Sequence, residues 1–518
     1  MKAWAYSEDQ LRTTHGIQPE AVVDTDAVFL NFDGITYGKG ASVLKQLVAV
    51  VGPAAFRAAC RAYTARHAWG TASLADFLAA VQDAVGAAVD VRAWAAEWLV
   101  APGLNTLAPE LTLDAGGCLV RLLRVSQSAP DAWPTLRSHT LEVAFHDAAG
   151  VVMATLRVVV AGPSTEVALP PGGLALPRAL AYVNANHDDH AYAKIALDPL
   201  TLAFARSGGV SPRSCPSPLN RQLLYDALWD MTRDARLPAT AYVGIALRAL
   251  PEETNAELAA SVLRRCDACV ATYLRVGRAA RPAEGLYQLC ARLAVAPGGP
   301  PSLRTVYTRA MPAFAGAAAA GAEALVALLD TPAPGGPVLD QGARWAALAV
   351  TAARGAPGTD ARIEGELARD GSDRGRRGAV TARAAVPDAA VKAAAWAAFV
   401  DPASRASLHE AAAAMAGFWL GRSGLPEGVQ RFYEDAFFGA VGAVFETRGK
   451  QFAQAFFGAL VPRCDDDGAV LARVRARACE RPCARLTWAA VTDNRAPRRA
   501  AGGPGAPVPA TDARCEAG

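Results

Sequence analysis

Apolar residues recur at helical spacing through the first hundred residues. In the segment 41–52 they fall three and four positions apart on one stripe, and Gly52-Pro53 ends this helix and begins the next. Another helix is expected after Thr71-Ala72-Ser73, where either hydroxyl can cap its start. A fourth is marked by Trp94, Trp98 and Leu99. The pattern therefore predicts a helical domain over residues 1–104.

The apolar period changes from helical spacing to alternation between residues 105 and 205. In the segment HTLEVAFH, residues Leu141, Val143 and Phe145 alternate with their neighbours, a turn follows at DAAG, and a β-branched run resumes at residue 151. Further short strands are expected at 111–125, 165–170, 178–184 and 191–198. This number of strands predicts a β-sandwich domain over residues 105–205.

Helical patterns separated by Pro/Gly-rich turns return at residue 212 and continue to residue 495. Many helices of similar length with short turns favour a stacked α-solenoid, although no strict repeat period is present. The segment 501–518 is rich in proline and glycine, and we expect it to be disordered. The predicted fold class is mainly α with a β-sandwich insert, a multi-domain α+β chain.

Composition limits the partners that this chain can have. Its 518 residues are 52% hydrophobic and 19% charged, as in ordinary globular proteins, and the net charge is only +3. This charge favours neither nucleic acid nor an anionic membrane as a partner. The first thirty residues hold no apolar run like that of a signal peptide, so we expect a cytoplasmic protein with reduced cysteines.

Three short motifs hold residue types that bind metals, and each is interpreted as structural. Cys266 and Cys269 lie inside a helical pattern without a second pair at zinc-ribbon spacing. The sequence HDDH at 187–190 predicts a solvated loop, because adjacent side chains point to different sides and cannot all reach one ion. His409 begins an H-E-x-x-H-like stretch, but the second histidine is missing. The run of arginines between 374 and 383 is interpreted as a solvated loop between helices.

Tyr37 stands out in the segment NFDGITYGKGASVLKQL, directly before a Gly-Lys-Gly step at the start of a predicted helix. The two glycines offer no side chain for this phenol to pack against. From the residues alone, the chain is a multi-domain protein without a complete active site.

This segment resembles the zinc aminopeptidase N family, in the form with a long helical C-terminal domain like that of the antigen-trimming aminopeptidases. Further similar segments follow in the same order, including DDHAYAKIALD, ALWDMTRDARLPA and FETRGKQFAQAFF. The resemblance implies the helical end of a thermolysin-like catalytic domain, then a β-sandwich, then an α-superhelix. It also implies zinc as the family cofactor, peptides as the substrate class, and Tyr37 as the residue whose hydroxyl donates a hydrogen bond to the transition-state oxyanion.

The sequence departs from the family pattern because it contains neither H-E-x-x-H nor G-x-M-E-N. The resemblance places both motifs before Tyr37, so we expect a C-terminal part of such an enzyme, from a misplaced gene start, a split gene or a decayed copy. We expect this chain to bind no zinc and to be inactive alone. The alternatives are a non-catalytic α-solenoid scaffold for peptides or proteins, and a subunit that complements a separate N-terminal half.

The same reasoning predicts exposed apolar surface. If the first helices normally pack against a preceding part of a catalytic domain, their apolar faces should be partly uncovered here. The residues expected to show this are Val43, Leu47, Phe56 and Phe77.

Overall fold

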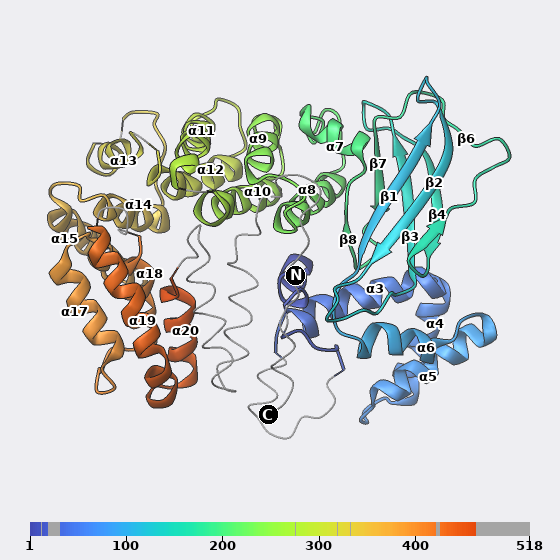
Figure 1. The fold of residues 1–518 in the computed structure, drawn as a ribbon, viewed down its shortest axis with the longest axis horizontal. Helices are drawn as coiled ribbons and strands as arrows, with labels where there is room; N and C mark the ends of the chain where they lie inside the picture. Colours follow the sequence, from blue (N-terminus) through green and yellow to red (C-terminus); the bar gives the residue numbers. More distant parts are fainter. Residues whose placement is uncertain are drawn as a thin grey trace. The chain divides into compact units, whose positions relative to one another are not determined.

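The chain divides by its internal contacts into two units, Met1–Leu237 and Pro238–Gly518. The computed structural model, drawn in Figure 1, describes residues 1–11, 13–18, 32–274, 276–318, 320–331, 333–420 and 425–462. The predicted tail at 501–518 and the end of the predicted helical domain after residue 462 lie outside these ranges. The contacts divide the chain once, after Leu237, and the predicted three-part division stays a prediction.

Helices open the first unit: α1 (Lys2–Asp9), η1 (Ile35–Lys39), α3 (Gly40–Val51), α4 (Pro53–Arg66), α5 (Leu74–Val85), η2 (Gly86–Ala88), α6 (Val91–Ala95) and η3 (Ala96–Val100). Their ends follow local chemistry. Gly52 ends α3 with a φ of 85°, a conformation that glycine adopts without steric cost, and Pro53 begins α4. Ser73 caps α5 in a reciprocal pair with Asp76, so Ser73 is the capping hydroxyl.

The prediction of uncovered apolar faces is wrong for the centre of α3. Val43 and Leu47 are both 0% exposed, because they pack in one cluster with Trp98 of η3 and with α1. Phe56 and Phe77 are half-buried at the edge of this cluster, where their rings meet edge to face at 6.4 Å. The centre of α3 is therefore covered within this unit, whereas α4 and α5 keep partly exposed apolar residues.

Two sheets follow, built from β1 (Thr106–Leu113), β2 (Leu119–Ser128), β3 (His139–His146), β4 (Val152–Val160), β5 (Ser164–Glu166), β6 (Leu174–Ala175), β7 (Tyr182–His187) and β8 (Lys194–Ile195). One sheet has the order β5-β2-β1-β8 with β6 on β2, and the other has the order β4-β3-β7. Leu107 and Val125 of the first sheet share an apolar cluster with Val143, Phe145 and Val158 of the second. This common core confirms a β-sandwich-like domain in a mainly α fold.

The first unit ends with α7 (Pro199–Arg206) and α8 (Pro218–Arg233). Each begins with proline at its first position and is capped by the residue before it, Asp198 for α7 and Ser217 for α8. Both helices contact β7. They therefore cover the edge of the three-stranded sheet.

The described part of the second unit is helical: α9 (Ala239–Ala249), η4 (Leu250–Glu252), α10 (Ala256–Ala268), η5 (Cys269–Tyr273), α11 (Val276–Ala294), α12 (Pro301–Ala315), α13 (Gly321–Asp330), α14 (Gln341–Ala353), α15 (Thr359–Arg369), α16 (Asp373–Ala385), α17 (Ala389–Val400), α18 (Leu408–Phe418), α19 (Glu427–Thr447) and α20 (Lys450–Leu460). The even-numbered helices form one row, in which each helix packs on the next even-numbered helix: α10, α12, α14, α16, α18 and α20. Such a layer is what stacked helix pairs produce.

The arginine run lies on a helix, which corrects its interpretation as a loop. All four arginines belong to α16, where Arg377 pairs with Asp373 one turn earlier and Arg383 pairs with Glu364 of α15. Two of the four arginines are therefore paired with carboxylates of α15 and α16. Considered singly, the described helices are too short or too polar to cross a bilayer, although the pair Ile35–Val51 and Pro53–Arg66, bent by 117°, has sufficient combined length and apolar content.

Candidate functional site

Tyr37 lies on η1, a single turn of π-helix directly before α3. Its side chain is 42% exposed, and its ring meets the ring of Phe32 edge to face at 4.9 Å. Its hydroxyl has no hydrogen-bond partner within the described residues. Single π turns occur frequently at functional sites. The phenol is thus presented to solvent by a backbone turn that is uncommon in helices.

The N-terminal end of η1 is held by two carboxylates. Oδ1 of Asp33 accepts hydrogen bonds from the backbone N–H groups of Ile35 at 3.0 Å and Thr36 at 2.9 Å. Oδ2 of Asp33 bonds to Nε2 of His15 at 2.7 Å, and Oε2 of Glu8 accepts from the N–H of Gly34 at 2.5 Å. These contacts satisfy N–H groups that the start of a helix leaves unpaired.

The charge states at this end follow from the same contacts. The hydrogen bond with Asp33 raises the pKa of His15, although burial opposes the shift. Burial acts to raise the pKa of Asp33, but the bonds from His15 and the backbone prevail and lower it. Both pKa shifts favour the charged forms of this pair.

The C-terminal end of η1 is held by a buried ion pair. Nζ of Lys39 lies 3.0 Å from Oδ2 of Asp9, and both side chains are 0% exposed. The same Nζ donates to the carbonyl oxygen of Gly103 at 3.1 Å. Burial lowers the pKa of Lys39 to about 8, with Asp9 acting in the opposite direction. Lys39 is two residues from Tyr37, so the ion pair fixes the turn that carries the phenol.

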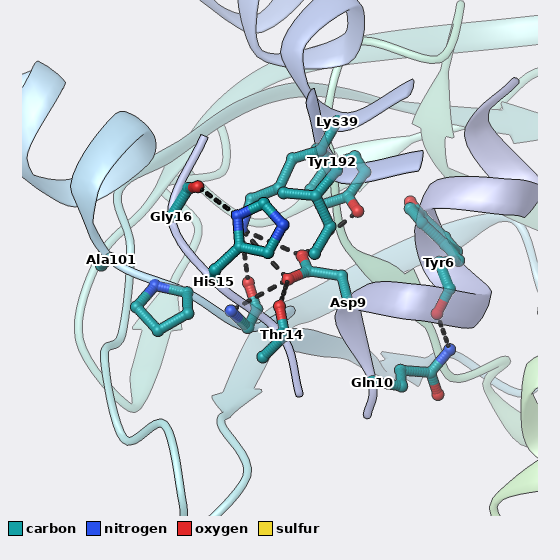
Figure 2. A network of polar contacts seen from close by, with 12 residues as sticks. Tyr6, Asp9, Gln10, Thr14, His15, Gly16, Lys39, Ala101 and Tyr192 are labelled. Atoms are coloured by element: carbon teal, nitrogen blue, oxygen red, sulfur yellow. Dashed lines mark hydrogen bonds and ion pairs between the residues drawn. The ribbon is translucent and has the colours of Figure 1, made fainter. Parts of the chain in front are cut away.

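Asp9 is the centre of this network, and Figure 2 shows Thr14, Lys39 and Tyr192 arranged around its carboxylate. Thr14 donates through its hydroxyl at 2.5 Å, the N–H of Gly103 donates at 3.0 Å, and the hydroxyl of Tyr192 donates at 3.2 Å. Burial raises the pKa of Tyr192 well above its ordinary value, which keeps this phenol a donor. We call Asp9, Thr14, Lys39, Gly103 and Tyr192 the Asp9 network.

Gly38 and Gly40 flank Lys39, and close packing requires a glycine only at position 38. A Cβ at Gly38 would lie 2.7 Å from the carbonyl oxygen of Met1 and 2.9 Å from the Cβ of Ala5, so only glycine allows α1 to pack this closely on η1. A Cβ at Gly40 would have its nearest neighbour at 3.9 Å. The first glycine is therefore required by packing, whereas the second is not.

The HDDH segment at 187–190 was only partly understood from its sequence. Adjacent side chains do diverge: Asp189 pairs with Lys2, whereas Asp188 is exposed. However, ligand atoms of Asp188 and His190 lie within 4.8 Å of each other and of the carboxylate of Glu142 on β3. The interpretation as a solvated loop missed this group because Glu142 comes from a different strand.

The other metal-like motifs behave as structural elements. Cys266 and Cys269 are free, fully buried thiols near Cys290, and burial raises the pKa of Cys269 and of Cys290 to about 12. Such thiols remain protonated at neutral pH and are poor nucleophiles. His409 is exposed on α18, whose start is capped by Ser407 and Glu410.

Sequence comparisons identify relatives over most of the chain. The model of the peptidase family M1 domain matches residues 1–98, and the model of the ERAP1-like C-terminal domain matches residues 182–477. Aminopeptidase N of Streptomyces lividans is 37% identical over 413 residues, which is 77% of this chain and 47% of that protein. Probable aminopeptidase 1 of Sulfurisphaera tokodaii is 34% identical over 113 residues, covering 22% of this chain and 14% of that relative.

A solved structure shows the same fold. Legionella pneumophila aminopeptidase A, crystallised with aspartic acid, aligns with a TM-score of 0.57 and 11% identity, over 92% of this chain and 58% of that one. The chain thus spans about half the length of the Streptomyces relative, and its two matched domains follow each other in one polypeptide. From these matches, the chain belongs to the M1 aminopeptidase N family.

Proposed function

We propose that this chain is the C-terminal part of an aminopeptidase N-like zinc metallopeptidase, an enzyme that removes amino acids from the N-terminus of peptides. Tyr37 is the residue assigned to catalysis, as the hydrogen-bond donor to the oxyanion of the tetrahedral intermediate. The observation that carries this role is the partly exposed side chain of Tyr37, whose hydroxyl has no partner in the described residues, on a turn held at both ends.

The chemical role follows from the properties of a phenol. A tyrosine hydroxyl is neutral at physiological pH and donates one hydrogen bond. A donor contributes most when it is already aimed at the developing charge, because no reorganisation is needed during the reaction. The contacts of Asp33 and Lys39 supply that rigidity by fixing both ends of η1.

Among the residues that the structure describes, those around Tyr37 do not fit a catalytic zinc ion. Such a site needs three protein ligands and an open position for the water that the metal activates. Here the carboxylate of Asp9 pairs with Lys39. The carboxylate of Asp33 bonds to His15 and to backbone N–H groups. We therefore derive no step through zinc in this chain and propose that it does not hydrolyse peptides alone.

The experiment has two arms. In the first, the purified chain is incubated with zinc and alanyl- or leucyl-p-nitroanilide, and we expect no turnover; turnover with stoichiometric zinc would refute the proposed inactivity. In the second, the chain is mixed with the complementary part of Streptomyces lividans aminopeptidase N. If activity appears, Tyr37→Phe should lower kcat by about 10²–10³, the usual loss for one oxyanion donor, with little change in KM.

A matched control is available on α4. Tyr63 is a half-buried tyrosine of the same unit, and its ring packs on Phe77 at 5.6 Å. Tyr63→Phe should leave kcat of the mixed sample unchanged. Equal effects of the two substitutions would contradict the role of Tyr37.

A second candidate function is a non-catalytic scaffold that binds peptides or proteins through its stacked helices. The ordered packing of α10, α12, α14, α16, α18 and α20 favours this alternative. Peptide binding without zinc, insensitive to Tyr37→Phe and lost on changes in the second unit, would support the scaffold over the peptidase. The expectations of an α-superhelix and of a cytoplasmic location stay predictions.

A further inference from the structure

We propose that Glu142, Asp188 and His190 form a binding site for a divalent transition-metal cation such as zinc. One candidate ligand atom from each residue lies within 4.8 Å of the other two. A metal ion between them would bring each atom to about 2.0–2.2 Å from the ion, which requires only small side-chain movements from this starting geometry.

Strand pairing brings these residues together from distant parts of the sequence. β3 pairs with β7 in antiparallel register, with Glu142 opposite His187. The turn that carries Asp188 and His190 begins directly after His187, so it lies beside Glu142. The sheet therefore sets the spacing of the three ligands, and no separate loop has to fold around the ion.

The turn itself is firmly held. Asp188 and Asp189 have φ values of 59° and 60°, a left-handed conformation that aspartate tolerates better than most residues. The buried side chain of Asn186 bonds to both the N–H and the carbonyl of Ala191, at 2.8 Å and 3.1 Å. Nζ of Lys45 donates to the carbonyl oxygen of Asp188 at 2.6 Å. These contacts hold the backbone of the turn, so they position Asp188 without engaging its carboxylate.

The ligand atoms of Glu142 and His190 are not taken up by other contacts in the described part of the chain, although Lys45 beside Asp188 and Arg157 opposite Glu142 bring positive charge to this end of the sheet. Glu142 and His190 make no hydrogen bond or ion pair within the described residues. The carboxylate of Asp188 lies 3.8 Å from Nε2 of His187, beyond hydrogen-bond length, and the nearby Lys2 is paired with Asp189. Two carboxylates this close repel each other, and a cation between them converts that repulsion into attraction.

The imidazole of His187 lies next to this group of residues. Nδ1 of His187 is buried and has no hydrogen-bond partner within the described residues. The residue pairs with Glu142 across the strands and adjoins Asp188 in sequence. Buried polar atoms are normally satisfied, so Nδ1 of His187 is an unpaired polar atom next to the three proposed ligands.

The donor set selects the class of ion. An imidazole nitrogen suits zinc, copper, nickel and iron better than magnesium or calcium, and two carboxylate oxygens suit a borderline ion rather than a soft one. Asp188 is exposed, so water can complete a four-coordinate shell of the kind that zinc adopts. The inference does not depend on the proposed peptidase function.

The test is zinc binding to the full chain after treatment with a chelator. Isothermal titration calorimetry should show a zinc site that Glu142→Gln, Asp188→Asn and His190→Gln each weaken by about ten-fold or more. Asparagine at 188 tolerates the left-handed conformation, so this variant keeps the turn. His409→Gln is the matched control, because His409 is an exposed histidine of the second unit.

Cobalt(II) separates this site from the cysteines, since thiolate ligands give a charge-transfer band that oxygen and nitrogen ligands do not. We expect cobalt to bind without that band. In the presence of chelator, the Asp188→Asn variant and the unmodified chain should have the same thermal unfolding curve. Zinc binding that persists unchanged in all three variants, an absence of zinc binding, or ligation by thiolates alone would each overturn the proposal.

Discussion

Replacement of Lys39 by methionine tests whether the Asp9 network supports the segment that carries Tyr37. Methionine fills a similar volume but removes the ammonium group that neutralises Asp9 at 3.0 Å in a fully buried site. Removal of one partner of a buried ion pair costs about 3–5 kcal/mol, because the remaining charge stays buried without compensation. Asp9 keeps the donors of Thr14, Gly103 and Tyr192, so we expect the low end, about 3 kcal/mol.

The measurement is thermal unfolding by calorimetry at neutral pH, with Arg66→Met as the control. Arg66 pairs with Asp83 at 3.3 Å, but both side chains are more than half exposed, and such pairs contribute about 0–1 kcal/mol. A unit of this size loses about 2–4 °C in Tm per kcal/mol, so Lys39→Met should lower the Tm of the first unit by about 6–12 °C. If Lys39→Met costs no more than Arg66→Met, the reasoning about the buried pair is refuted.

A double substitution separates loss of charge balance from loss of packing. Asp9→Asn removes the negative charge and keeps a side chain that can accept hydrogen bonds. Combined with Lys39→Met, it should recover part of the lost stability, with a coupling of about 0.5–3 kcal/mol between the two sites. Strictly additive effects would show that the two charges do not interact.

Three further predictions concern other buried groups. Gly38→Ala should destabilise the first unit by about 1–3 kcal/mol in urea unfolding, because its Cβ meets the backbone of Met1 at 2.7 Å, whereas Gly40→Ala in the same motif should be neutral or slightly stabilising; equal effects would contradict this packing argument. Burial raises the pKa of Asp230 to about 7, so the folded state keeps a proton that the unfolded chain loses near pH 4. Stability should therefore fall by up to about 4 kcal/mol as pH rises from about 4 to about 7, and unfolding curves of Asp230→Asn should lack this slope. Lys392 donates to the carbonyl oxygens of Ala384 and Phe418, each at 2.6 Å, and Lys392→Met should cost about 1–3 kcal/mol in thermal unfolding of the second unit. A loss larger than that of Lys39→Met would contradict the argument, since Lys392 leaves no buried carboxylate behind.

Features set by neighbouring residues could be predicted from the sequence. The end of α3 at Gly52 and the cap of α5 at Ser73 depend on residues within one turn, and both were found as expected. The alternation of Leu141, Val143 and Phe145 likewise located β3 and the face that joins the core of the sandwich, although the opposite face of this strand is largely buried as well. In each case the determining side chains lie close together in the sequence.

Features that join distant segments could not be predicted. Asp9 and Lys39 are 30 residues apart, and neither lies in a pattern that indicates burial. Glu142 meets Asp188 and His190 only because of the register between β3 and β7. The π-helical form of η1 had no local signal either, because the sequence around Tyr37 resembles an ordinary helix start. Tertiary contacts decide all three.

Gly103 has a consequence for how this chain tolerates insertions and deletions. The backbone N–H of Gly103 donates to Asp9 and its carbonyl oxygen accepts from Lys39, and Gly103 stands three residues before β1. Its φ of 87° and the close approach of Trp133 leave no room for another residue type. One residue added or removed beside it would shift the chain by about 3.3 Å and break both bonds. Surface loops usually accept changes in length, but this connection acts as a fixed-length spacer between the helices and the sandwich.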